Sequence, residues 1–250
     1  MEKQNPIGVF DSGVGGISVL KELVALCPGE DFLYFGDSAN APYGNKTTDQ
    51  VRKLTLQGAA YLFDRGCKAL VLACNTATAA AVYVLRETYP DRIIIGIEPA
   101  LKPAIDRFPA GRIGIMATAV TLREEKLNQL LARFPDAQVV RIPAPGLVEQ
   151  IEQGRADAPE TKALLAEILA PYKGQLDALV LGCTHYPFVK DTIEQILPIP
   201  LFDGGYGTAK QTLRCLEQAD LLNTQGGSVT IENSLGTAEI LTLCHNLLEV

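Results

Sequence analysis

The feature that most constrains the fold is a regular alternation of short apolar runs with longer segments of helical spacing. Several runs are apolar throughout, which favours strands that are covered on both faces. The segments between them, at 47–66, 75–89, 121–133 and 157–171, carry apolar residues at helical spacing. Such alternation is typical of βαβ units and predicts parallel sheets. The predicted strands are IGVF (7–10), DFLYF (31–35), ALVLA (69–73), IIIGI (93–97), RIGIM (112–116), QVVRI (138–142) and DALVLG (177–182).

The two halves of the chain contain similar pairs of segments. GVFDSGVGG and LACNTATA in the first half correspond to GIMATAVTL and LGCTHYPF in the second half. Each pair joins a strand followed by small residues to a strand that ends in a cysteine and a polar residue. Any α/β chain can produce such echoes, but the pairs also fit an α/β fold of two similar lobes. Each lobe is then a mainly parallel sheet flanked by helices, with an active site in the cleft between them.

Composition and charge exclude several classes of partner. The 250 residues are 47 % hydrophobic and 20 % charged, as in an ordinary globular protein, and the formal net charge is −7. No cluster of Lys or Arg is long enough to follow a phosphate backbone, so nucleic acid is not an expected partner. No apolar run approaches the roughly 18 residues of a membrane span, and the N-terminus does not resemble a signal peptide. We therefore expect a cytoplasmic protein with no membrane contact.

The six cysteines include no C-x-x-C pair, and the chain has two histidines. A zinc site and a redox dithiol are therefore disfavoured, and the cysteines are expected to be free thiols. A single cysteine of this kind usually behaves as a small buried hydrophobe. We keep that interpretation for Cys27, Cys67, Cys215 and Cys244.

Cys74 and Cys183 differ from the other four because they occupy matching positions in the two halves. Each follows a predicted buried strand and precedes a helix, at the sheet edge where parallel α/β folds bind ligands. Asn75 and Thr184 are suitable N-cap residues, and Pro187 suits a first helical turn. A helix N-terminus lowers the pKa of a thiol, so at least one of the two should titrate below about 8.5.

Several polar residues near these strand ends are candidates for a ligand site. His185 either assists the neighbouring thiol or bonds only locally. Asp11 and Ser12 begin either a tight βα turn or a turn that brings them to the cleft. The following glycines do not form the dinucleotide fingerprint G-x-G-x-x-G, because its third glycine position is Ser18.

Two further segments are candidates for binding an amino acid. Pro42-Tyr43-Gly44 follows the second strand and forms either a ligand-holding turn or a plain surface loop. Thr118 and Thr121 follow the fifth strand and either supply hydroxyl groups to a ligand or cap the next helix.

Four stretches together resemble glutamate racemase, of the aspartate/glutamate racemase superfamily. They occur in the order expected for that family and span most of the chain. The stretches are GVFDSGVGGISVL (8–20), FGDSANAPYG (35–44), LACNTATA (72–79) and LGCTHYPF (181–188).

The resemblance implies a first lobe of residues 1–97 and 208–250, and a second lobe of residues 98–207 inserted into it. It implies a homodimeric, cofactor-independent isomerase that binds glutamate and supplies D-glutamate for peptidoglycan. Cys74 would then take the α-proton from D-glutamate and Cys183 from L-glutamate, with Glu152 as an auxiliary carboxylate near Cys183. The implied substrate-binding or helper residues are Asp11, Ser12, Pro42, Tyr43, Gly44, Asn75, Thr76, Thr118, Thr121, Thr184 and His185.

The reaction explains why two thiols are needed. Inversion at the α-carbon removes a proton from one face and delivers another to the opposite face, which favours two groups on opposite walls. The site must also stabilise the developing carbanion, with water excluded. Alternatives are a racemase for aspartate or a hydantoin, and an amino-acid-binding protein without activity. A nucleotide-dependent dehydrogenase is disfavoured by the missing glycine fingerprint.

Overall fold

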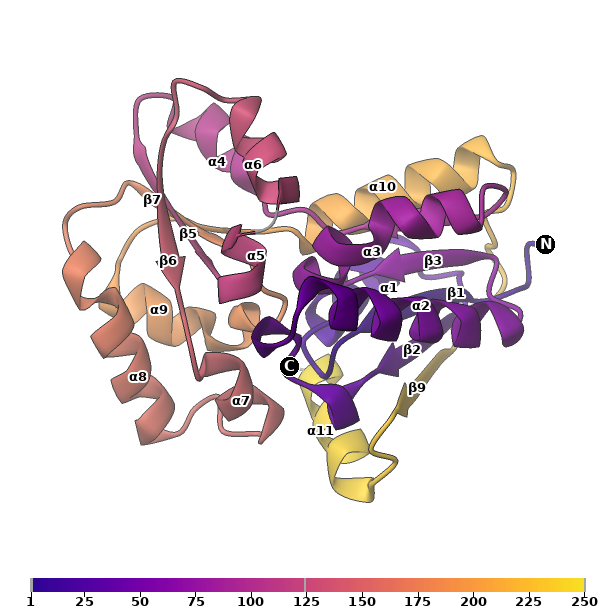
Figure 1. The fold of residues 1–250 in the computed structure, drawn as a ribbon. Helices are drawn as coiled ribbons and strands as arrows, with labels where there is room; N and C mark the ends of the chain where they lie inside the picture. Colours follow the sequence, from indigo (N-terminus) through magenta and orange to yellow (C-terminus); the bar gives the residue numbers. More distant parts are fainter. Residues whose placement is uncertain (1, 124, 250) are drawn as a thin grey trace.

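The computed structural model describes residues 2–123 and 125–249, which form two parallel sheets side by side (Figure 1). We call the five-stranded sheet and its helices the first lobe, at the right in Figure 1. The four-stranded sheet and its helices are the second lobe. The strand orders are β4-β3-β1-β2-β9 and β6-β5-β7-β8, and every pairing among the described residues is parallel.

The first lobe is built from both ends of the chain. Its strands are β1 (Ile7–Asp11), β2 (Phe32–Gly36), β3 (Ala69–Leu72), β4 (Ile93–Gly96) and β9 (Val229–Asn233). Its α-helices are α1 (Ile17–Leu26), α2 (Thr48–Asp64), α3 (Asn75–Thr88), α10 (Gly205–Gln218) and α11 (Ala238–Glu249), with 3₁₀ turns η1 (Ser38–Asn40) and η2 (Tyr43–Asn45).

The second lobe is built from the middle of the chain. Its strands are β5 (Arg112–Ala117), β6 (Gln138–Pro143), β7 (Ala178–Leu181) and β8 (Leu201–Asp203). Its helices and 3₁₀ turns are α4 (Leu101–Arg107), α5 (Ala119–Arg123), α6 (Glu125–Ala132), α7 (Leu147–Glu152), α8 (Pro159–Leu169), η3 (Ala170–Tyr172), η4 (Tyr186–Val189) and α9 (Lys190–Ile196).

Alternation along the strands explains why helices cover both faces of each sheet. In β1, Val9 faces the cluster formed with α1, α10 and α11, whereas Phe10 faces the cluster formed with α2 and α3. In β5, Ile115 packs with α4, α5 and α6, whereas Met116 packs toward α7, α8 and α9. Apolar residues at consecutive strand positions therefore serve two cores, as expected for buried parallel strands.

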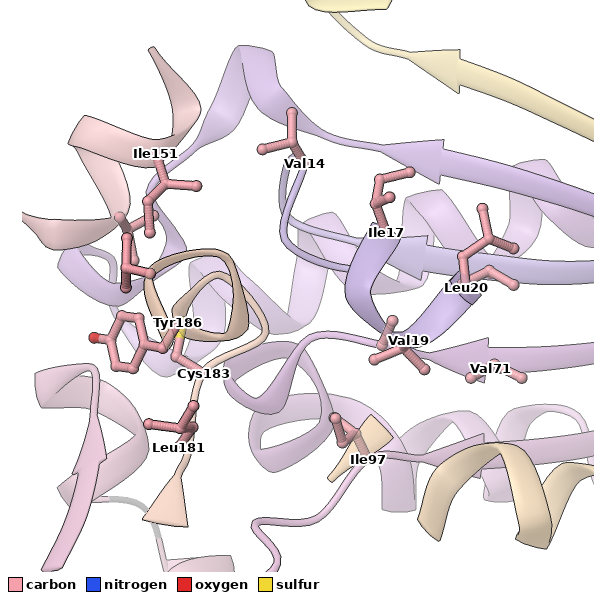
Figure 2. Close-up of a cluster of buried hydrophobic side chains, with 14 of the residues drawn as sticks. Val14, Ile17, Val19, Leu20, Val71, Ile97, Ile151, Leu181, Cys183 and Tyr186 are labelled. Atoms are coloured by element: carbon pink, nitrogen blue, oxygen red, sulfur yellow. The ribbon is translucent and has the colours of Figure 1, made fainter. Parts of the chain in front are cut away.

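One of the apolar clusters continues from one lobe into the other. Figure 2 shows Val14 and Ile17 of the first lobe in the same cluster as Ile151, Cys183 and Tyr186 of the second lobe. All five are buried. Burial of such a contiguous surface stabilises the contact between the lobes, because exposing it to water is unfavourable.

The predicted fold class and all seven predicted strands are confirmed. The sequence missed β8 and β9, which are short or partly exposed edge strands without a continuous apolar run. The predicted helix 121–133 begins earlier and is described as α5 and α6, with residue 124 outside the described residues. The lobe boundaries at 97/98 and 207/208 remain a prediction. Within the described ranges, no helix combines the length and apolar character that a membrane span requires.

A fully buried ion pair ties together the segments that lead into β2 and β3. Lys68 Nζ lies 2.5 Å from Glu30 Oε2, and both side chains are completely buried. Lys68 also donates to the backbone oxygen of Lys3, and Glu30 Oε1 accepts a hydrogen bond from the backbone N–H of Asn223. The pair therefore links the N-terminal segment, two strand entries and the connection before β9.

We predict that Lys68→Met lowers the free energy of unfolding by about 3–5 kcal/mol, because it leaves the Glu30 carboxylate buried without its cation. Lys102→Met is the control, since it breaks an exposed ion pair with Asp106 and should cost less than about 1 kcal/mol. Urea denaturation of both variants measures the difference. Equal losses would contradict the structural role of the buried pair.

Candidate active site

The carboxyl ends of strands from both lobes meet at one narrow cavity with about 270 Å³ of empty space. The first lobe contributes the segments after β1, β2 and β3, and the second lobe contributes those after β5 and β7. Ten predicted site residues line this cavity: Ser12, Tyr43, Gly44, Cys74, Asn75, Thr76, Thr118, Cys183, Thr184 and His185. Four of the predicted residues lie outside its lining: Asp11, Pro42, Thr121 and Glu152.

Cys74 forms the first-lobe side of the cavity and is itself the N-cap of α3. Its Sγ accepts a hydrogen bond from the backbone N–H of Ala77 at 3.4 Å and lies 3.4 Å from Ser12 Oγ. The prediction that Asn75 caps this helix is therefore wrong by one residue. The thiol occupies the capping position because β3 ends at Leu72, two residues before Cys74, and α3 starts at Asn75 directly after it.

The helix N-termini predict a lowered pKa for at least one of the two cysteines, and Cys74 does not have one. Burial and the negative charge of Asp11 raise the pKa of Cys74 to about 12, although its hydrogen bonds with Ser12 and Ala77 oppose the increase. The sequence shows the helix N-terminus but not the burial, nor the carboxylate that β1 brings next to β3. In the ligand-free protein Cys74 is therefore a thiol at neutral pH.

Cys183 forms the second-lobe side of the cavity and begins a chain of three functional groups. Its Sγ lies 3.7 Å from His185 Nδ1, and His185 Nε2 lies 2.5 Å from Glu152 Oε1. His185 is buried, and Glu152 is nearly so. The contacts from Cys183 through His185 to Glu152 are typical of a thiol whose basic partner is oriented by a carboxylate.

Two predictions about the helical turn after Cys183 have different outcomes. Pro187 lies in the first turn of η4, as expected. The predicted capping role of Thr184 is wrong, because Thr184 Oγ1 donates to Asp11 instead.

Electrostatics favour an imidazolium–carboxylate pair in this chain. Burial lowers the pKa of His185, but its hydrogen bonds to Cys183 and Glu152 and their charges outweigh that effect and raise it well above its usual value. Burial raises the pKa of Glu152, but the hydrogen bond and charge of His185, with hydrogen bonds from Val14 and Ser38, bring it below its usual value. His185 is thus a proton carrier that can donate to a Cys183 thiolate.

Asp11 links the two sides from beneath the cavity. It is fully buried, and its carboxylate accepts hydrogen bonds from the backbone N–H of Gly13 at 2.8 Å and from Thr184 Oγ1 at 3.0 Å. Burial raises the pKa of Asp11, opposed chiefly by the charge of His185. Asp11 therefore acts on both sides of the cavity, through its electrostatic effect on Cys74 and its hydrogen bond from Thr184 beside Cys183.

A triangle of hydroxyl groups joins the lobes on another wall. Thr76 Oγ1 lies 3.1 Å from both Thr118 Oγ1 and Thr121 Oγ1, and the latter two are 3.0 Å apart. Gly44 is required beside them, because a Cβ at that position would lie 2.9 Å from the Cβ of Thr118. Thr118 also accepts from the backbone N–H of Thr121, so both predicted roles, hydroxyl donor and helix cap, are compatible with its position.

The turn that contains Tyr43 is held by Asp37. Tyr43 is buried, and its hydroxyl donates to Asp37 Oδ2 at 2.7 Å. Pro42 lines a neighbouring cavity of about 550 Å³ rather than the narrow one, and Gly44 and Thr118 line both. The segment is therefore part of the site and not a plain surface loop.

Asn75 has a buried polar atom that needs a partner. Its Oδ1 has no hydrogen-bond partner among the described residues, and the residue lines the cavity. A buried unsatisfied acceptor is costly, which indicates that a donor on a ligand completes it.

Sequence reasoning missed three residues around the site. Val148 of α7 lines the cavity but belongs to an ordinary apolar pattern that carries no signal. Asp37 and Ser38 lie in the GDSANA segment after β2, and Ser38 Oγ donates to Glu152 Oε2 at 2.9 Å. Their position at a strand end was a usable signal. The partner of Asp37, Tyr43, is near in the sequence, whereas the partners of Ser38 are far away.

Comparisons with known proteins identify the family of this chain. The family model described as Asp/Glu/Hydantoin racemase matches residues 7–212. A curated glutamate racemase from Clostridium acetobutylicum is 49 % identical over 253 residues, covering 99 % of each chain. The chain belongs to the Asp/Glu/hydantoin racemase family. The predicted resemblance to glutamate racemase is thereby confirmed.

Solved structures of this racemase family share the two-lobed fold. Glutamate racemase from Francisella tularensis in complex with D-glutamate has a TM-score of 0.87 and 30 % identity, covering 99 % of this chain and 95 % of that one. Escherichia coli glutamate racemase in complex with L-glutamate and the activator UDP-MurNAc-ala has a TM-score of 0.86 and 29 % identity, with 97 % and 95 % covered.

We predict that two substitutions move the titration of Cys74 in this racemase in opposite directions. Asp11→Asn removes a negative charge and should increase alkylation of Cys74 at pH 9 roughly tenfold, as for a midpoint about one pH unit lower. Ser12→Ala removes a hydrogen bond and should slow alkylation. Iodoacetamide labelling against pH, with the modified cysteines identified by peptide mass spectrometry, measures both. Changes of the same sign would show that access, rather than charge, controls the thiol.

Proposed function

We propose that this racemase interconverts L- and D-glutamate without a cofactor, by transferring protons between Cys74, Cys183 and the α-carbon. The observation that carries the proposal is that both thiols, one from each lobe, line the same narrow cavity. A substrate bound there lies between two acid–base groups. Each turnover needs one group as thiolate and the other as thiol, and their roles exchange with the direction of reaction.

On the Cys183 side, His185 and Glu152 support proton transfer. The imidazolium stabilises a thiolate when Cys183 is poised to take a proton, and it returns a proton when Cys183 must deliver one. The Glu152 carboxylate, 2.5 Å from Nε2, fixes the orientation of the ring. We propose that this wall faces the α-proton of L-glutamate.

On the Cys74 side, the supporting groups are Ser12, the N-terminus of α3 and Asp11. The substrate's ammonium group opposes the charge of Asp11, so binding should make the Cys74 thiolate easier to form than in the free protein. A thiol of high pKa also suits a weakly acidic C–H bond better than a thiol of low pKa, once it is deprotonated. We propose that this wall faces the α-proton of D-glutamate.

The remaining polar groups supply the contacts that an amino acid needs. The unsatisfied Oδ1 of Asn75 is suited to accept a hydrogen bond from the substrate's ammonium group. The hydroxyl groups of Thr76, Thr118 and Thr121 bond to one another and can reorient to donate to a carboxylate. Such preorganised donors stabilise negative charge as it develops on the substrate.

Glutamate is favoured as substrate because relatives that cover nearly the whole chain are glutamate racemases, including structures with D- and L-glutamate bound. The family description also includes aspartate and hydantoin racemases, which are the remaining alternatives. Supply of D-glutamate for peptidoglycan and a homodimer stay predictions from the resemblance, and a cytoplasmic location stays a prediction from the sequence.

We predict that the purified, dialysed protein racemises L- and D-glutamate at equal kcat/KM, because the two enantiomers have equal free energy in solution. Aspartate should react at least about 100-fold more slowly, since its shorter side chain cannot satisfy the same buried groups. Chiral chromatography of reactions with and without pyridoxal phosphate measures this. Activity that depends on added pyridoxal phosphate, or a preference for aspartate, would overturn the proposal.

A further inference from the structure

Glu152 belongs to the second lobe, but its carboxylate is bound largely by groups of the first lobe. Oε1 accepts a hydrogen bond from the backbone N–H of Val14 at 2.7 Å, and Oε2 accepts one from Ser38 Oγ at 2.9 Å. Val14 follows β1, and Ser38 follows β2. The group that orients His185 is therefore fixed only while the two lobes are in contact.

The orientation of the Ser38 hydroxyl is set by a second hydrogen bond, which it accepts from Asn233. Asn233, at the end of β9, donates from Nδ2 to Ser38 Oγ at 2.9 Å. The amide of Asn233 faces this way because its Oδ1 accepts the backbone N–H of Leu235 at 3.0 Å. Since Ser38 Oγ accepts from Asn233, its single proton is available to Glu152.

We propose that Ser38, oriented by Asn233, is a positioning residue that holds Glu152 in place and thereby holds His185 against Cys183. This proposal rests on the proposed function of Cys183. Neither Ser38 nor Asn233 lines the cavity, so both act through Glu152 rather than on the substrate. The chain of contacts runs from β9 through the turn after β2 to the second lobe.

The charged groups around Glu152 and His185 determine whether a substitution at Ser38 raises or lowers their pKa values. His185 faces Glu152, Cys183 and Asp11, and Glu152 lies near Asp11, Tyr34 and Cys244 as well as His185. The hydrogen bond from Ser38 helps to lower the pKa of Glu152. Its loss raises the pKa of Glu152 and leaves the carboxylate less firmly held against His185 Nε2. The imidazolium then loses part of the hydrogen bond and charge that stabilise it, so the pKa of His185 falls.

Ser38→Ala tests the proposal by two independent measurements. The chain has two histidines, so ¹⁵N-histidine NMR can follow His185 with His245 as internal reference. The pKa of His185 should fall in the variant. In assays, kcat/KM at pH 7 should fall about tenfold, the effect of losing one hydrogen bond to a charged group. The acid limb of its pH profile should move to higher pH, because the Glu152 carboxylate is protonated earlier.

Two further variants separate positioning from general structure. Ser38→Thr keeps the hydroxyl and should restore both the His185 titration and the pH profile. Ser234→Ala removes a hydrogen bond from the backbone N–H of Ala39, between the same two segments, and should leave both readouts unchanged. A Ser38→Ala variant with the wild-type His185 pKa, or a Ser234→Ala variant with an equal shift, would overturn the proposal. The NMR titration needs no substrate, so it remains decisive if the proposed racemisation fails.

Discussion

The site depends on the contact between two parallel sheets whose carboxyl edges face each other. In each sheet, a cysteine lies at that edge, two residues after the end of a buried apolar strand. Cys74 follows β3 and Cys183 follows β7. The apolar cluster that continues from Val14 to Ile151 keeps the edges together. Without this contact each lobe would carry one thiol, and the two walls that an inversion requires would not exist.

The two walls are chemically different although the two halves of the sequence are similar. Cys183 has a buried histidine and a carboxylate behind it, whereas Cys74 has a hydroxyl, a helix N-terminus and a buried aspartate. The equilibrium constant between enantiomers requires equal kcat/KM in both directions, whatever this asymmetry. The difference between the two walls can therefore change kcat and KM in one direction relative to the other, but only by the same factor in both constants.

Sequence patterns predicted the features that depend on neighbouring residues along the chain, namely the strands and the cysteines that follow them. Most of the seven predicted strands were found because residues on both of their faces are buried, and the two cysteines because each follows such a strand. The edge strand β6 is largely exposed and was found from its β-branched residues alone. Among the strands that the structure describes, β9 is an edge strand paired with β2, and its partly exposed residues lack a continuous apolar run. The high pKa of Cys74 and the contacts among Ser38, Asn233 and Glu152 join residues distant in sequence. Such contacts depend on tertiary packing and leave no local pattern.

The most direct test of the two-thiol account is the early distribution of deuterium in D₂O. L-glutamate is converted by the wild-type protein to low conversion, the enantiomers are separated, and each is analysed by mass spectrometry, with the reverse reaction run in parallel. The account predicts α-deuterium in the enantiomer formed and α-protium in the unreacted enantiomer, because the product receives its proton from the thiol on the far wall. Product that retains the substrate's own proton would contradict it, since a single base would then serve both faces.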